Sequence, residues 1–222
     1  MMRKLSVVVP ALNEAAGIER CLRALAPLRG RGHERIVADG GSEDGTPRLA
    51  APLADRLVAA PRGRALQMNA GAAAASGDAL LFLHADTLLP PEADRAALAA
   101  LGARAWGRFD VTIDSRDARL AVVGFCMNWR SRLTGIATGD QAIFVRRADF
   151  PGFPPIALME DVAFSKRMKT VSPPACLRER VCTSARRWER RGVLRTVLLM
   201  WRLRLAYRLG ADADELARRY SH

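Results

Sequence analysis

Five short clusters of the sequence hold side chains that could bind a charged ligand or move a proton. Four of them contain carboxylates and one contains two arginines; they are Asn13-Glu14, Asp39–Thr46, Arg62–Asn69, His84–Asp86 and Glu160-Asp161. Carboxylates hold Mg²⁺ or Mn²⁺ and accept protons from hydroxyl groups, and arginines bind phosphate through charge-assisted hydrogen bonds. Together the clusters could bind a diphosphate with a divalent cation and activate a hydroxyl group.

The first two clusters combine hydrogen-bond acceptors with turn-forming residues. Asn13-Glu14 follow an apolar run that ends at Pro10, where they could form a ligand site or an ordinary helix cap with a first-turn acid. Asp39–Thr46 contains three glycines, and its carboxylates could accept hydrogen bonds from a base or a ribose. The segment matches neither the dinucleotide-binding glycine pattern nor a Walker loop, which argues against those two classes.

The next two clusters suit a diphosphate and its cation. Arg62 and Arg64 flank a glycine at the start of a predicted helix, a good site for a diphosphate, although a solvated basic loop would look the same. Asp86 follows the most apolar predicted strand, where a carboxylate could hold a metal ion. His84 lies on the same side as Asp86 if the strand geometry continues, as a second ligand or as a structural histidine.

Glu160 and Asp161 open a predicted helix. As first-turn acids they would do no more than complement the helix dipole. In a crevice, one of them could instead remove the proton of an acceptor hydroxyl group.

Alternating strands and helices must position these clusters. Strands are predicted at residues 5–9, 34–38, 56–60 and 79–83, and helices at 14–28, 47–53, 64–76 and 91–101. Apolar strands joined by helices predict an α/β fold with a mainly parallel central sheet and helices on both faces. Ligands of such sheets bind outside the carboxyl ends of the strands, so the clusters should converge on one crevice.

The second half of the chain is less regular, and a long basic helix follows it. Strands are predicted at residues 107–113, 142–146 and 177–182, and helices at 118–133, 160–168, 192–209 and 212–220. No internal repeat or linker interrupts the chain. We therefore expect one domain.

Taken in order, the clusters resemble the inverting family 2 glycosyltransferases of the GT-A fold. The resemblance runs over about residues 5–190 and is led by Val7–Glu14 and Asp39–Thr46. Leu83–Thr87 lies where that family places its Asp-x-Asp metal motif, and Gly139–Gln141 and Glu160-Asp161 follow in order. The His-Ala-Asp-Thr motif resembles that of a bacterial subgroup of small family 2 transferases, some of them found beside radical-SAM proteins.

The resemblance implies a role for each cluster. The residues implied to bind the nucleotide donor are Pro10, Asn13, Glu14, Asp39, Ser42, Asp44, Arg62, Arg64 and Asn69. Those implied to lie by the sugar and the acceptor are Asp140, Gln141, Arg187 and Trp188. Asp86, with His84, would bind a divalent metal, Mn²⁺ or Mg²⁺. Asp161 is the expected catalytic base, with Glu160 as second choice.

The implied reaction is a single displacement by a non-processive transferase. The base takes a proton from an acceptor hydroxyl group, which attacks the anomeric carbon of a nucleotide sugar, most commonly a UDP-sugar, while the metal stabilises the departing diphosphate. Two departures from the family pattern stand out. His84 replaces the first Asp of Asp-x-Asp, and Ser184 replaces the Gln of the Gln-x-x-Arg-Trp motif of processive members.

We expect residues 1–222 to form a single GT-A domain with three parts. Residues 1–100 would form the nucleotide-binding half and 101–190 the acceptor half. Residues 191–222 would form a basic amphipathic helical tail. The whole chain has a net charge of +12, and residues 163–222 carry 15 basic and 5 acidic side chains, so the excess belongs to the C-terminal quarter.

The predicted helix at 192–209 has two apolar stripes separated by arginines. One stripe contains Leu199, Met200, Leu203 and Tyr207, and the other contains Leu194, Leu198, Trp201 and Leu205. A surface helix needs only one apolar stripe. The second could meet the terminal helix folding back, another copy of the chain, or an anionic membrane that carries a lipid-linked acceptor.

Other functional classes fit less well. A nucleotidyltransferase usually carries a Gly-rich basic loop after the first strand, which Pro10–Glu14 lacks, and no nucleic-acid-binding motif accompanies the basic tail. A catalytically inactive scaffold protein is a further alternative, because His84 replaces the first acid of the metal motif. No apolar run is long enough for a spanning helix, and the four scattered cysteines indicate reduced thiols. We expect a cytoplasmic protein, peripheral on the inner face of the plasma membrane if the tail binds lipid.

Overall fold

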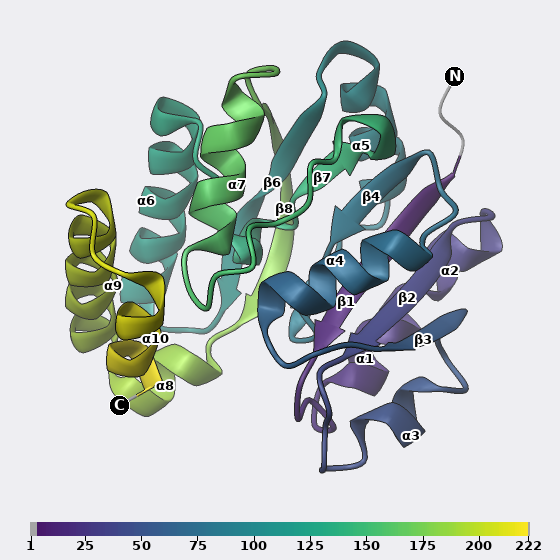
Figure 1. Ribbon diagram of the computed structural model, residues 1–222, viewed down its shortest axis with the longest axis horizontal. Helices are drawn as coiled ribbons and strands as arrows, with labels where there is room; N and C mark the ends of the chain where they lie inside the picture. Colours follow the sequence, from purple (N-terminus) through teal and green to yellow (C-terminus); the bar gives the residue numbers. More distant parts are fainter. Residues whose placement is uncertain (1–3, 222) are drawn as a thin grey trace.

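An eight-stranded mixed sheet forms the centre of the protein, seen here in a computed structural model that describes residues 4–221 (Figure 1). In spatial order the strands are β3 (Arg56–Ala59), β2 (Glu34–Asp39), β1 (Leu5–Ala11), β4 (Ala79–Phe82), β7 (Phe144–Arg146), β6 (Trp106–Asp114), β8 (Ala175–Ser184) and β5 (Thr87–Leu88). The run from β3 to β4 is parallel, as is the pair of β6 and β8. The predicted parallel sheet is thus confirmed, with antiparallel pairing at β7 and β5.

Helices cover both faces of the sheet, as the apolar strands predicted. One face carries α1 (Ile18–Ala24), α2 (Ala26–Gly30), α3 (Thr46–Ala50) and α5 (Ala93–Ala103). The other carries α4 (Arg64–Ala74) and α7 (Glu160–Lys169). Side chains of β1 alternate between the two cores, because Val7 and Val9 pack toward α1 while Val8 packs toward α4.

The single helix predicted at 14–28 is divided in the structure. α1 begins only at Ile18, and Leu25 separates it from α2. Pro27 has no N–H group to continue the helical hydrogen bonds, which explains the break. The two-residue strand β5 and the short helix α8 (Arg186–Arg191) were not predicted from the sequence.

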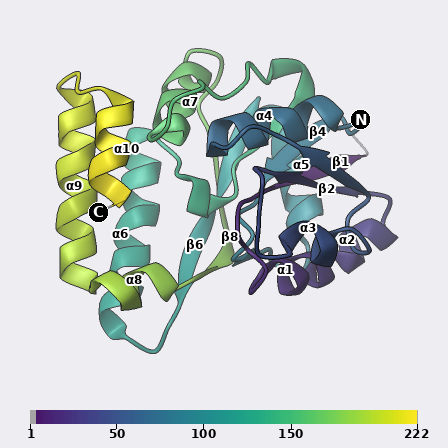
Figure 2. The ribbon, with the colours of Figure 1, turned by 60° about the horizontal axis from the view of Figure 1, so that its bottom comes forward.

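The remaining helices gather at one end of the molecule. α6 (Ala118–Thr134) packs beside β6, and α9 (Val193–Arg208) lies next to it (Figures 1 and 2). α10 (Ala213–Ser221) folds back on α9, where Leu216 packs against Leu203 and Met159. The terminal helix therefore covers one of the two apolar stripes of α9. Among residues 4–221, no helix combines the length and apolar character that a bilayer crossing needs. All four cysteines are free.

Candidate active site

The chain order of the strands brings the predicted clusters to one edge of the sheet. β1, β2, β3 and β4 are parallel, so the segments that follow them share this edge. β7 runs antiparallel to β4, so the short helix η1 (Gly139–Gln141) that precedes β7 lies at the same edge. The segment after β8 also arrives there, because β8 is parallel to β6 and β6 is antiparallel to β7.

Hydrogen bonds join the loop after β1 to the loop after β2. The Asn13 N–H donates to Ser42 Oγ at 2.9 Å, and Asn13 Oδ1 accepts from the Glu43 N–H at 2.9 Å. The Ala15 N–H donates to Asp44 Oδ2 at 2.9 Å. Asn13 has a φ of 55°, a left-handed conformation that Asn tolerates better than most residues. The two clusters therefore form one polar rim, as strand order predicted.

Asp39 fixes the shape of this rim. Its carboxylate accepts the N–H groups of Gly41 and Ser42 at 3.0 Å each and the Ser42 hydroxyl at 2.5 Å. Gly41 has a φ of 86°, which favours glycine. Pro10 is buried in β1 beside Ala38 of β2, directly before this rim.

Asp86 lies beyond the end of β4 beside two charged neighbours. Arg186 Nη2 is 3.4 Å from Glu14 Oε2 and 3.9 Å from Asp86 Oδ2. Burial and the negative charge of Asp86 raise the pKa of Glu14, and Arg186 opposes that rise. Arg186 was not singled out in the sequence, although it directly precedes the predicted Arg187. Asp86 and Glu14 thus form a small acidic pair facing one arginine.

His84 contacts Asp140 through one ring nitrogen, and its other ring nitrogen is buried. Its Nδ1 lies 3.3 Å from Asp140 Oδ1. Its Nε2 is buried without a hydrogen-bond partner, and a Cβ placed on Gly139 would lie 2.5 Å from it. Nδ1 faces Asp140 in this arrangement, and a role of His84 as a metal ligand stays a prediction. The ring holds the Asp140 carboxylate.

Three carboxylates gather around η1 and the start of α7. Asp161 Oδ2 accepts the Gly139 N–H at 2.9 Å, and Glu160 Oε1 lies 3.5 Å from Arg64 Nη1. Burial and the neighbouring Glu160 raise the pKa of Asp161 to about 6, while the Gly139 N–H and Arg64 oppose the rise. A carboxylate with this pKa is well matched to accepting a proton near neutral pH.

The pKa of Asp140 is shifted in the opposite direction to that of Asp161. Burial alone would raise the pKa of Asp140, but the hydrogen bond and charge of His84, with the charges of Arg187 and Arg64, hold it well below its usual range. Two neighbouring carboxylates whose pKa values are driven apart are the pattern of an acid–base site. Arg64 therefore belongs to this cluster, whereas Arg62 is exposed and forms no ion pair within residues 4–221.

Three predicted site residues contact other parts of the fold, and their assigned roles stay predictions. Asn69 Nδ2 donates to the Phe153 carbonyl oxygen and Asn69 Oδ1 accepts the Phe153 N–H, each at 2.8 Å, which holds the loop before α7. Gln141 is fully buried, and its Oε1 accepts the Thr138 N–H at 3.2 Å. Trp188 packs against an apolar cluster formed by Ile113, Leu120, Ala185 and Val193.

Residues 6–149 match the protein family described as "Glycosyl transferase family 2". The chain belongs to glycosyl transferase family 2. The matched segment includes the polar rim, Asp86 and Asp140. Glu160, Asp161 and Arg187 lie beyond it, so their place in the site rests on the geometry described above. The family match decides against the nucleotidyltransferase and nucleic-acid-binding alternatives.

Relatives and solved structures agree with this family. The chain is 36% identical over 98 residues to glucosyl-3-phosphoglycerate synthase of Mycobacterium tuberculosis, a match that covers 40% of this chain and 30% of that protein. A crystal structure of that synthase with Mn²⁺, UDP and glucosyl-3-phosphoglycerate is similar with a TM-score of 0.59 and 22% identity, over 80% of this chain and 70% of that one. S. aureus TarS with UDP-GlcNAc gives a TM-score of 0.64 and 18% identity, over 82% and 58%. The predicted GT-A fold is confirmed.

One residue of this family 2 site was missed in the sequence. Arg130 of α6 has Nε and Nη2 buried without hydrogen-bond partners within residues 4–221. Burial lowers its pKa, while the charges of Asp161 and Asp140 stabilise the cation. A guanidinium with unused donors beside the carboxylates is a candidate binding group for an anionic part of a substrate. An Arg within an amphipathic helix carries no sequence signal for this role.

We expect the Arg130→Met variant to be more stable but less active than the natural protein. Removing a desolvated cation without hydrogen bonds should raise the melting temperature, whereas losing a charge-assisted contact should lower kcat/KM about 10- to 100-fold. Differential scanning fluorimetry and a transfer assay measure both. The exposed Arg116→Met is the matched control, and a less stable Arg130→Met would show that the residue supports the fold instead.

The carboxylates at this edge of the sheet could hold a divalent metal only together with other ligands. Within residues 4–221, no group of three or more His, Cys, Asp or Glu side chains is placed to hold a metal ion alone. Asp86 has a side chain that is 30% exposed, and its nearest partners are weak contacts at 3.3 Å to Thr87 and 3.9 Å to Arg186. Mg²⁺ sites often use one or two carboxylates and complete their shell with substrate phosphates. The site therefore fits a metal that binds together with a diphosphate.

Proposed function

We propose that this protein is a non-processive, inverting glycosyltransferase that moves one sugar from a UDP-sugar to a hydroxyl group of an acceptor. The single observation that carries the proposal is the position of Asp161, a carboxylate at the sheet edge that accepts the Gly139 N–H at 2.9 Å and lies beside Glu160 and Arg64. The family match and the neighbours crystallised with UDP or UDP-GlcNAc support the donor class.

The donor would bind across the nucleotide-binding half, residues 1–100. The rim formed by Asn13, Asp39, Ser42 and Asp44 would receive the base and ribose, and Glu14 lies beside it. Arg64 and the exposed Arg62 would bind the diphosphate at the start of α4. When bound at Asp86, a divalent metal such as Mn²⁺ or Mg²⁺ would act as a Lewis acid toward the departing diphosphate.

The acceptor would bind against residues 101–190, where Asp161 acts as the base. Its carboxylate takes the proton of the acceptor hydroxyl group, whose oxygen forms the new bond to the anomeric carbon as the bond to the diphosphate breaks. The Gly139 N–H keeps Asp161 oriented, and Arg64 holds Glu160. Asp140 stays ionised beside His84 and can accept a hydrogen bond from a sugar hydroxyl group. Arg187, near Asp140, would contact the donor or the acceptor.

Thermal-shift screening of UDP, GDP and dTDP, each with and without Mn²⁺, tests the donor class. UDP with Mn²⁺ at about 100 times its Kd should stabilise the protein by about 2.7 kcal/mol, which corresponds to roughly 5–10 °C for a chain of this size. If none of the three nucleotides raises the melting temperature, the transferase proposal fails. Binding without turnover of any UDP-sugar would instead favour an inactive scaffold, for which the loss of the first motif acid at His84 is the supporting observation.

A further inference from the structure

α9 presents an apolar stripe to solvent on the side opposite its packed face. Its packed face meets α10 and the segment before α7 through Leu203, Leu199 and Tyr207. The exposed stripe consists of Leu194, Leu198, Trp201, Leu205 and Leu209, with exposed fractions of 70%, 56%, 70%, 59% and 79%. At about 100° per residue, the four of these positions that lie within α9 fall within an arc of about 60°, and Leu209 follows directly at the end of the helix. α10 thus covers only one of the two apolar stripes that the sequence predicts for this helix.

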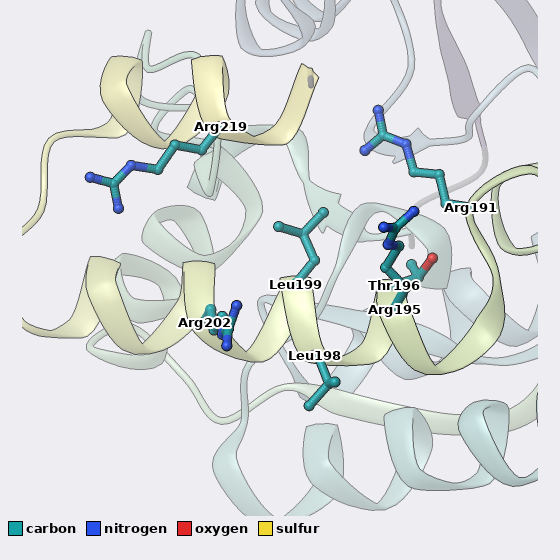
Figure 3. Close-up of a pocket in the computed structure, with 7 residues that line it drawn as sticks. All are labelled: Arg191, Arg195, Thr196, Leu198, Leu199, Arg202 and Arg219. Atoms are coloured by element: carbon teal, nitrogen blue, oxygen red, sulfur yellow. The ribbon is translucent and has the colours of Figure 1, made fainter.

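Arginines border this exposed stripe on both sides. On the helix, Arg195 and Arg202 follow one edge of the stripe, and Arg204 and Arg208 follow the other. Figure 3 shows the first edge, with Leu199 directed toward α10, Leu198 directed away from it, and Arg195 and Arg202 between them. None of these four arginines forms an ion pair with an acid in the part of the chain that the structure describes.

A groove between α9 and α10 adds further positive charge beside the stripe. It has a volume of about 420 Å³, and four arginines line it together with Thr196 and two leucines (Figure 3). The arginines are Arg191, Arg195, Arg202 and Arg219. Arg191 donates to the Tyr220 carbonyl oxygen and Arg219 pairs with Glu215, so Arg195 and Arg202 are the two that would meet a phosphate group attached to an acyl chain.

The neighbouring helix α6 carries a second exposed apolar stripe. Val122, Phe125, Trp129 and Leu133 recur at helical spacing, with exposed fractions of 61%, 61%, 50% and 79%. α6 lies next to α9 in Figure 1, and Val193 at the start of α9 shares an apolar cluster with Leu120 of α6. This end of the protein therefore exposes nine large apolar side chains on two adjacent helices, which is unusual for a surface that meets only water.

We propose that α9, assisted by α6, is a docking surface for an anionic phospholipid membrane. A helix with an apolar stripe edged by arginines can lie in the plane of the interface, with its apolar side chains among the acyl chains and its guanidinium groups at the phosphates. Each arginine near an anionic surface strengthens binding about fivefold. The 15 basic and 5 acidic side chains of residues 163–222 match the sign of such a surface.

The same features disfavour the other occupants of this face. In a two-fold dimer the same patch meets itself, so the arginine rows of α9 would face the identical rows of the second copy. A nucleic acid would satisfy the arginines but would leave the five apolar side chains of α9 without a partner. An anionic bilayer is the occupant that satisfies both the charge and the apolar stripe.

Vesicle co-sedimentation of the full chain tests the proposal at low salt. We expect binding to phosphatidylglycerol–phosphatidylcholine vesicles and none to phosphatidylcholine alone, with a blue shift of Trp fluorescence on binding. Combined Leu198→Ser and Trp201→Ser substitutions should weaken binding at least tenfold, and so should Arg195→Glu with Arg202→Glu. Val171→Ser, an equally exposed apolar position outside α6 and α9, is the matched control and should bind unchanged.

Three results would overturn the proposal. The first is no binding to anionic vesicles at low salt, and the second is binding that the α9 variants leave unchanged. The third is a dimer in light scattering, without lipid, that Leu198→Ser with Trp201→Ser converts to a monomer, because a second copy would then occupy the face. All readouts are independent of sugar transfer, so they hold whether or not the proposed activity is found.

Discussion

Replacing Asp161 with asparagine should lower the rate of sugar transfer by about 10²- to 10⁴-fold while leaving UDP binding intact. Asparagine keeps the size of the side chain and can still accept the Gly139 N–H through its carbonyl oxygen. It cannot take a proton from the acceptor hydroxyl group. Because the donor rim lies on other loops, the thermal shift produced by UDP should be the same in both proteins.

The pH dependence of the natural protein gives a second measurement on the same group. The base works only when it is ionised, so kcat should rise with pH and level off above about pH 6, where the raised pKa of Asp161 lies. The effect on stability has the opposite sign. Since the folded-state pKa of Asp161 exceeds its usual value of 3.8, the folded state loses stability relative to the unfolded state as pH rises from about 4 to 6. Asp161→Asn should therefore melt at the same or a higher temperature at pH 8.

A carboxylate away from the site provides the matched control for this substitution. Asp149 is partly exposed and pairs with Arg146 at 3.8 Å, so Asp149→Asn should keep its activity and its pH profile. If Asp161→Asn retains turnover, Asp161 is not the base, and Glu160→Gln becomes the next variant to measure. If Asp161→Asn is inactive but also fails to bind UDP, the defect would be structural and the assignment would be lost.

The fold was predictable because strand and helix patterns in this chain are local. Residues 5–9, 36–38 and 79–83 are mainly apolar, and the structure places β1, β2 and β4 at these positions. Parallel order then brings the segments after them to one edge. The antiparallel direction of β7 could not be predicted from a strand of three residues, yet it brings Asp140 to the same edge of the sheet.

The candidate site was predictable only at the level of segments. Asn69 and Gln141 lie in the expected segments, but the loop at Phe153 and the turn at Thr138 take up their polar atoms. Arg130, in contrast, was not predicted as a site residue, because its burial depends on how α6 packs in the folded protein. Side-chain partners are set by contacts between distant segments, which sequence periodicity does not report.

The Asp86→Asn variant should lose the part of UDP binding that depends on Mn²⁺. Asp86 is the carboxylate at the end of β4 with the fewest strong partners, and its replacement removes the charge that would hold the cation. Lewis-acid stabilisation is worth several kcal/mol and each 1.4 kcal/mol corresponds to tenfold in rate, so transfer should fall about 10²-fold or more. The same substitution removes a charge that raises the pKa of Glu14, so it should not destabilise the fold.

Thermal shifts with UDP alone and with UDP and Mn²⁺ separate a metal role from a structural one. Asp86→Asn should keep the shift with UDP alone and lose the additional shift with Mn²⁺, whereas the exposed Asp114→Asn should keep both. His84→Asn is the companion variant, because His84 contacts Asp140 through Nδ1. It should retain the Mn²⁺ effect while lowering kcat. If Asp86→Asn keeps the additional thermal shift with Mn²⁺, Asp86 does not hold the cation and the metal site lies elsewhere.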